Sequence, residues 1–317
     1  MAPPPFRFAL ADALADVLVV AALVVAAALA AWRIRLWRDR EEESRLREIH
    51  TLTGSVEVHP EFRSAVLGTT RRVWVYLPPP YAREPERRFS VLYMQDGQNV
   101  FDGATAFVAG MEWEADETVE RLSEAGRIEP LIVVAVDNGG LRRAWEYLPT
   151  GDERAKDGGG ADVYGRMLLE ELKPWVEKTY RTLPGPAHTG IAGSSLGGIA
   201  ALYLGLTHPD VFGRIASLST SVWWDDRWIV RFVEGLPSRP EAHIWTDIGT
   251  AESRDAVPSA RALRDALVRK GWREGSDLRY VEVDGAVHDE AAWAKRLPDV
   301  LEFLFPPGPD ASRTEPR

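Results

Sequence analysis

The stretch TGIAGSSLGG, residues 189–198, decides the fold. Its first four residues predict a short buried strand, and residues 196–207 predict a helix. Because no loop separates the two, Ser195 must lie in a sharp turn between strand and helix. Side chains at Gly193 and Gly197 would collide with neighbouring backbone in such a turn, which explains why both positions are glycine.

The pattern Gly-x-Ser-x-Gly around Ser195 indicates chemistry as well as geometry. The turn exposes the serine hydroxyl above the N-terminus of the following helix. Backbone N–H groups and the positive end of the helix dipole there stabilise developing negative charge. We therefore predict that Ser195 is a nucleophile and that the backbone N–H of Leu196 is one oxyanion donor. The alternative is a glycine-rich turn without chemical meaning.

Strands and helices alternate outward from this turn. A helix is predicted at Asp162–Tyr180 and another at Pro258–Lys270. The remaining predicted strands are Arg72–Leu77, Ser90–Met94, Leu131–Val136, Arg214–Leu218, Ala242–Asp247 and Leu278–Val283. This order predicts an α/β fold: a mostly parallel central sheet of about eight strands with helices on both faces, and an edge hairpin within residues 55–77. Active sites in such sheets lie at the carboxyl ends of the strands.

The composition excludes several classes of function. The chain has 317 residues, of which 45% are hydrophobic and 27% charged, and this is an ordinary globular mixture. The formal net charge of −10 argues against a nucleic-acid partner, which needs a basic surface. With no cysteine, the chain has no disulfide, thiolate metal site or cysteine nucleophile. No histidine or carboxylate cluster has metal-ligand spacing, so no metal or cofactor is expected.

The N-terminus is a separate feature. Val17–Trp32 is an uncharged run that spans about 24 Å as a helix, and four arginines follow it within residues 33–40. We predict a single membrane anchor within residues 1–38, with the side of the membrane left open. A cleaved signal peptide, giving a secreted or periplasmic protein, is the alternative; a soluble amphipathic helix is disfavoured because the run is apolar all round.

The domain organisation follows from this. Residues 39–53 are charged and read as a linker, residues 54–305 as the catalytic domain, and residues 306–317 as a disordered polar tail.

A serine nucleophile needs a base. The order of the chain favours His288, which lies in a loop after the late strand Leu278–Val283 and before the final helix. The other histidines are less suitable. His50 lies in the linker, and His59 precedes a proline in the first strand region. His188 and His243 lie at the wrong end of a strand, and His208 ends the helix that follows Ser195.

The base in turn needs an acid. Asp247, Glu252 and Asp255 all follow the strand Ala242–Asp247, and periodicity does not choose among them. Asp289 is expected to cap the last helix instead.

The loop after Ser90–Met94 is expected to supply a second oxyanion donor. Gly97 permits a tight turn that could aim the backbone N–H of Gln98 at the site, although a simple turn would have the same sequence.

Residues 54–305 resemble the putative-esterase family of α/β-hydrolases, which includes enterochelin and other siderophore esterases, feruloyl esterases, S-formylglutathione hydrolases and mycolyltransferases. The resemblance rests, in chain order, on residues 92–102, 136–139, 190–198, 219–224 and 249–252 and on His288. It implies the α/β-hydrolase fold, Glu252 as the acid, and Gln98 and Leu196 as the oxyanion hole. The segment from Ser219 to Trp224 looks most like the siderophore-esterase branch.

These features predict a serine esterase that forms an acyl-enzyme with a small-molecule ester. Trp223 and Trp224 are expected to wall the pocket and to suit aromatic or siderophore-like acyl groups, although they could simply fill the core. Arg142 and Arg143 could meet a substrate carboxylate, but they are predicted to be solvated surface charges. An acyltransferase with the same triad and a catalytically inactive, membrane-tethered binding module are the alternatives, and the oligomeric state is left open.

Overall fold

The computed structural model describes residues 28–29 and 31–308 and divides the chain into two compact units, Met1–Ile49 and His50–Arg317. In the first unit, residues 31–46 are helical. Within the described residues, no helix is both long enough and apolar enough to cross a membrane. Most of the predicted anchor Val17–Trp32 and of the predicted C-terminal tail lies outside the described residues.

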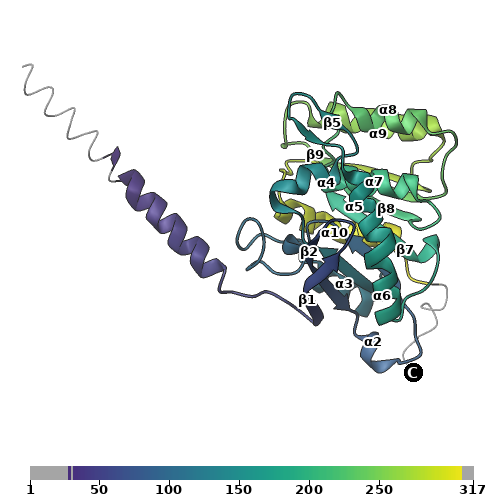
Figure 1. Cartoon of the computed structure of the whole chain (residues 1–317), viewed down its shortest axis with the longest axis horizontal. Helices are drawn as coiled ribbons and strands as arrows, with labels where there is room; N and C mark the ends of the chain where they lie inside the picture. Colours follow the sequence, from purple (N-terminus) through teal and green to yellow (C-terminus); the bar gives the residue numbers. More distant parts are fainter. Residues whose placement is uncertain (1–27, 30, 309–317) are drawn as a thin grey trace, which may run out of the picture. The chain divides into compact units, whose positions relative to one another are not determined.

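The second unit is built on an eight-stranded sheet of order β1-β2-β4-β3-β7-β8-β9-β10. Figure 1 labels β1, β2, β7, β8 and β9 of this sheet. The edge hairpin β1–β2 is antiparallel, as is the β2–β4 pair, and every other neighbouring pair is parallel. The mostly parallel sheet and its edge hairpin confirm the predicted fold class. The strands are β1 (Ser55–Ser64), β2 (Thr69–Leu77), β3 (Ser90–Met94), β4 (Leu131–Val136), β7 (Thr189–Ser194), β8 (Arg214–Leu218), β9 (His243–Gly249) and β10 (Leu278–Val283).

Helices cover both faces of the sheet because successive side chains along each strand point to opposite faces. Val73 and Val75 belong to one hydrophobic cluster, whereas Trp74 and Tyr76 belong to the other. The first cluster includes side chains of α5 (Ala161–Arg166), α6 (Lys173–Thr179), α7 (Leu196–Thr207), α8 (Trp228–Gly235) and α9 (Ala256–Lys270). The second includes side chains of α3 (Ala115–Glu124) and α10 (Glu290–Leu304).

The helix predicted at Asp162–Tyr180 is interrupted. A π-helical turn, Met167–Leu172, separates α5 from α6. Pro174 is the second residue of α6. A proline lacks the N–H that an α-helix requires, and its ring crowds the preceding turn. The wider turn accommodates this residue. The minor elements are α2 (Pro80–Arg83), η1 (Gly97–Asn99), η2 (Gly140–Arg142), α4 (Arg143–Tyr147), η4 (Pro186–His188) and the small hairpin β5–β6 (Gly151–Asp152 and Asp157–Gly158).

The segment that enters the second unit is held to it by hydrogen bonds. His50 Nδ1 lies 2.7 Å from Asp102 Oδ2, and the backbone N–H of Thr53 donates to Asp116 at 2.6 Å. These contacts involve residues that the sequence assigned to the linker, so the folded unit described here begins at His50.

Candidate active site

Ser195 occupies the sharp turn that the sequence predicts. It has φ 58° and ψ −121° and directly precedes α7. A Cβ added to Gly193 would lie 2.4 Å from the carbonyl oxygen of Gly197, so backbone alone excludes a side chain there. At Gly197 a Cβ would lie 3.2 Å from side-chain atoms of the β3 loop, which is tight but is not a backbone collision. The turn therefore depends most strongly on Gly193.

The Ser195 hydroxyl contacts another serine. Its Oγ lies 3.2 Å from Ser221 Oγ, and the backbone N–H of Ser221 donates to the Ser195 carbonyl at 3.1 Å. Within the described residues, Ser195 Oγ makes no hydrogen bond to His288. Hydrogen bonds between a nucleophile and its base are often long without substrate and tighten when substrate binds.

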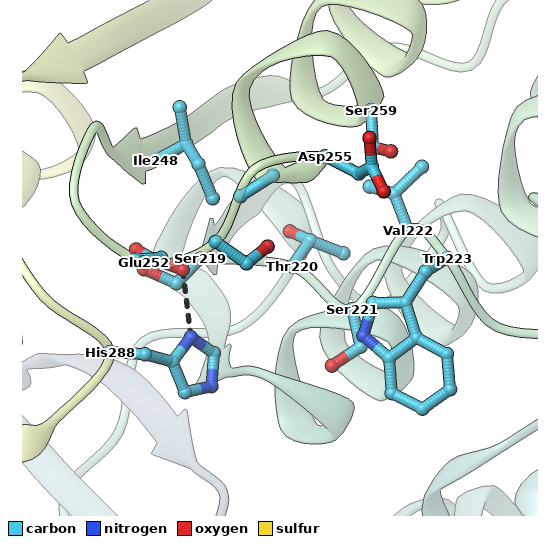
Figure 2. Close-up of a pocket in the computed structure, with 12 residues that line it drawn as sticks. Ser219, Thr220, Ser221, Val222, Trp223, Ile248, Glu252, Asp255, Ser259 and His288 are labelled. Carbon is cyan, nitrogen blue, oxygen red and sulfur yellow. Dashed lines mark hydrogen bonds and ion pairs between the residues drawn. The ribbon is translucent and has the colours of Figure 1, made fainter.

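His288 and Glu252 form a close pair, marked by the dashed line in Figure 2. His288 Nδ1 lies 2.7 Å from Glu252 Oε2, and the Glu252 side chain is 4% exposed, against 40% for His288. Of the three acids that the sequence left open, Glu252 is the one that contacts His288. Asp247 is fully buried and pairs with Arg296, and Asp255 lies at the start of α9.

Ser219 holds Glu252 in place. Its hydroxyl accepts hydrogen bonds from Trp293 Nε1 at 2.9 Å and from Arg296 Nη2 at 3.2 Å, and lies 2.5 Å from Glu252 Oε1. Indole and guanidinium nitrogens can only donate, so both lone pairs of Ser219 are occupied and its proton is directed to Glu252. The backbone N–H of Gly249 donates to the same carboxylate oxygen at 2.7 Å.

These contacts set the charge of the two buried acids. Burial alone would raise the pKa of Glu252, but hydrogen bonds from His288, Ser219 and Gly249 outweigh burial and lower it. Burial raises the pKa of Asp247 to about 6, although Arg296 and the indole of Trp245 oppose the rise. Glu252 is therefore the carboxylate that stays charged beside the histidine.

The loop after β3 packs closely against the end of β4. A Cβ on Gly97 would lie 2.6 Å from the carbonyl carbon of Val136, so only glycine fits. Gln98, whose backbone N–H is the predicted second oxyanion donor, has its side-chain oxygen 3.2 Å from the backbone N–H of Asn138. The predicted first donor, the N–H of Leu196, belongs to the first residue of α7, where amides have no acceptor within the helix.

Arg143 helps to hold this loop, which corrects its prediction as a solvated surface charge. Its guanidinium donates two hydrogen bonds to Asp96, at 2.6 and 2.8 Å, and it is 27% exposed. Asn138 Nδ2 also donates to Asp96, at 2.6 Å. The loop that carries Gln98 is therefore anchored one residue before Gly97.

A cleft of about 560 Å³ opens beside these residues and is lined by Ser219, Ser221, Glu252 and His288. Trp223 also lines it and is 63% exposed. Trp224 was expected beside Trp223 but is 5% exposed, belongs to the hydrophobic core and donates to the carbonyl of Thr150 at 3.1 Å.

Sequence reasoning missed the supporting residues. Ser219 and Ser221 lie in a segment singled out for its tryptophans, and no local pattern separates their roles. Arg296 is buried among the apolar residues of α10. An arginine at such a position indicates that it pairs with a buried polar group, and this was the signal available in the sequence. Asp289 does cap α10, since its side chain accepts from the N–H of Ala292 at 2.8 Å. Among the described residues, no group of three or more acids and histidines could hold a metal ion.

The sheet order and the serine turn after a central parallel strand are those of an α/β-hydrolase. The chain belongs to the family described as "Putative esterase", whose model matches residues 64–304. A solved structure, the BES protein from Bacillus cereus, shares this fold with a TM-score of 0.63 at 21% identity, over 80% of this chain and 96% of its own.

Curated relatives are similar at the level of sequence. The chain is 26% identical to the uncharacterized protein YbbA of Bacillus subtilis over 74% of this chain and 92% of that protein. It is 31% identical to a siderophore enterobactin esterase of Emericella nidulans, over 68% of this chain and 75% of the relative. It is 27% identical to the iron(III) enterobactin esterase of Dickeya dadantii over 77% of this chain, but it spans only 54% of that relative. The family is thus related to siderophore esterases.

Proposed function

We propose that this protein is a serine hydrolase of carboxylic esters, with Ser195 as nucleophile, His288 as base and Glu252 as the acid that orients the base. The observation that carries the proposal is the His288–Glu252 pair, 2.7 Å apart, in a cleft beside a serine held at φ 58°. A glycine-rich turn without a chemical role would not require a buried, charged carboxylate to face the histidine.

The proposed mechanism has an acylation and a deacylation stage. As Ser195 Oγ attacks the ester carbonyl, Nε2 of His288 takes its proton, because Nδ1 faces Glu252. The backbone N–H groups of Leu196 and Gln98 hold the oxyanion. The protonated His288 then gives its proton to the leaving alcohol, and an acyl-enzyme remains. Water then attacks the acyl carbonyl as His288 takes its proton, and His288 returns that proton to Ser195 Oγ as the acid leaves.

We further propose a class for the acyl group of the ester. The relatives named as siderophore esterases, together with the exposed indole of Trp223 in the cleft, support an aromatic or siderophore-like acyl group. Trp224 no longer supports this assignment, since it lies in the core.

A fluorophosphonate probe tests the proposal on the full chain. We expect mass spectrometry to find the label on Ser195, and we expect the His288→Ala variant to lose the label while retaining its fold. A folded wild-type protein that takes no label would refute the nucleophile and leave the binding module as the function.

We also propose that Val17–Trp32 anchors the chain in a membrane, as the apolar run and its arginine flank suggest. The full chain is then expected in the membrane fraction and to resist carbonate extraction, while a chain lacking residues 1–38 is expected in the supernatant. Release of the full chain by carbonate, or the loss of these residues from the mature protein, would contradict the anchor.

A further inference from the structure

The cleft extends past the candidate catalytic residues to the start of α9. His288 and Glu252 lie at one side, and Asp255 and Ser259 lie at the other (Figure 2). Val222, Ile248 and Ala256 also line the cleft. The cleft thus joins apolar walls to a polar end that the proposed hydrolysis does not use.

Asp255 precedes α9 in the position of an N-cap, but its side chain makes no capping hydrogen bond. The aspartate in the same position of α10, Asp289, caps its helix at 2.8 Å. Among the described residues, the Asp255 carboxylate has neither a hydrogen bond nor an ion pair, although aspartate is a favoured capping residue. Its carboxylate is therefore available to the cleft.

Ser259 lies one helical turn after Asp255 on the same side of α9. It is 6% exposed, and within the described part of the chain its hydroxyl has no hydrogen-bond partner. Ser259 lines the cleft, so a ligand there can reach its hydroxyl. Two unpartnered oxygen groups therefore face one space, and one of them is a carboxylate.

We propose that this end of the cleft binds a cationic group of the substrate, an ammonium carried on an aliphatic chain. An ammonium only donates hydrogen bonds, and Asp255 and Ser259 both offer acceptors. The apolar walls fit the methylene chain, and the exposed indole of Trp223 in the same cleft is a surface that cations favour. This inference rests on the proposed function and adds a substrate class to it: esters that carry a primary amine.

Paired 4-nitrophenyl esters test the proposal. Each pair has acyl chains of equal length, one ending in an ammonium and the other in a methyl group, and a series of lengths allows for the depth of the cleft. We expect the wild-type full chain to show the higher kcat/KM with the ammonium ester. In Asp255→Asn, which keeps the shape and removes the charge, this preference should fall about 10- to 100-fold, as for a hydrogen bond to a charged group.

Asp210→Asn is the matched control. Asp210 is also exposed but precedes β8, at the amino ends of the parallel strands and away from the cleft, so the wild-type preference should persist. An equal kcat/KM for the two esters at every length, or an unchanged preference in Asp255→Asn, would overturn the subsite. So would equal hydrolysis of a hydroxyl-ended ester, since that would indicate recognition of a neutral polar group.

Binding separates this inference from the proposed function. Alkylammonium ions, titrated calorimetrically into the full chain, should bind more tightly than alkanols of the same length, and Asp255→Asn should abolish the difference. If the probe labels Ser195 but alkylammonium ions bind no more tightly than alkanols, the cation subsite alone is overturned. If the probe does not label Ser195 but alkylammonium ions bind more tightly than alkanols, the proposed hydrolase activity is overturned and the cation site remains.

Discussion

Replacing Ser219 with alanine tests whether its hydroxyl holds Glu252 for catalysis. The change removes the hydrogen bond to Glu252 and leaves two buried donors, Trp293 Nε1 and Arg296 Nη2, without that acceptor. An unsatisfied buried group costs about 1–3 kcal/mol. In a domain of this size that corresponds to a fall in Tm of roughly 3–10 °C. The freed carboxylate should also orient His288 less well, and we expect kcat for ester hydrolysis to fall about tenfold or more.

The dependence on pH distinguishes this role from simple packing. Because the folded state lowers the pKa of Glu252, its ionisation stabilises the protein above the unfolded pKa of about 4.3, and this contribution is lost as the pH falls through the folded pKa. Ser219→Ala moves the folded pKa back up. The difference in Tm between wild type and variant should therefore be larger at pH 7 than near pH 3.

The control for this experiment is Ser90→Ala. Ser90 is equally buried, but it begins β3 at the amino ends of the parallel strands, where its hydroxyl lies 3.2 Å from His188 Nδ1. It should lower Tm while leaving kcat near wild type. The reasoning about Ser219 fails if Ser219→Ala keeps kcat within twofold of wild type, or if the difference in Tm is the same at both pH values.

The remaining predictions concern the acid, the oxyanion loop and the buried pair. Glu252→Gln should lower kcat about 10⁴-fold, since the amide favours the wrong histidine tautomer, and stopped-assay kinetics with wild-type-like circular dichroism would check it. Gly97→Ala places a Cβ 2.6 Å from the Val136 carbonyl carbon, so the loop must shift; kcat should fall about 10²- to 10³-fold, and an unchanged kcat would exclude Gln98 as a donor. Asp247→Ala removes the carboxylate that pairs most closely with buried Arg296 and leaves Glu252 Oε1, 3.9 Å away, as its remaining anionic neighbour; denaturant unfolding should show a loss of about 3–5 kcal/mol, whereas a loss below about 1 kcal/mol would mean that Glu252 or water compensates the charge.

Much of this protein could be predicted from local sequence patterns. A continuous apolar run such as Leu131–Val136 is typical of a buried parallel strand, and its six residues are all buried. The position of Ser195 between a strand and a helix could also be predicted, because the geometry of a Gly-x-Ser-x-Gly turn depends on the backbone of the motif itself. These features depend on neighbours in the chain, which a sequence displays directly.

Features that depend on distant partners escaped prediction. Glu252 could not be separated from Asp247 and Asp255 by pattern, since the choice rests on which side chain reaches a loop 36 residues later. Arg143 looked like a surface charge because its partner Asp96 lies 47 residues earlier. Neighbouring Trp223 and Trp224 differ in burial because one faces the cleft and the other packs beside β6, where Gly158 leaves room for its ring.

Three non-glycine residues with positive φ connect the sheet to this site. Asp96, Ser195 and Ser219 have φ values of 56°, 58° and 43°, and they follow the ends of β3, β7 and β8 respectively. Such a conformation costs of order 1–3 kcal/mol per residue and persists only where the surroundings over-determine it. At each position a specific bond compensates: Asp96 pairs with Arg143, Ser219 with Glu252, and the amide of Ser195 donates to the carbonyl of Leu218 at 3.0 Å.

The strain therefore falls on the residues that position the proposed oxyanion loop, nucleophile and acid. Positive φ lets the chain leave the extended path of the strand at these three positions, in a conformation that non-glycine residues rarely adopt. If positive φ at Ser219 carries this cost, Ser219→Gly relieves the backbone strain but loses the hydroxyl. We therefore expect Ser219→Gly to have the same kcat as Ser219→Ala and a higher Tm. Equal Tm values for the two variants would show that φ at this position carries no cost and that the hydroxyl alone explains the serine.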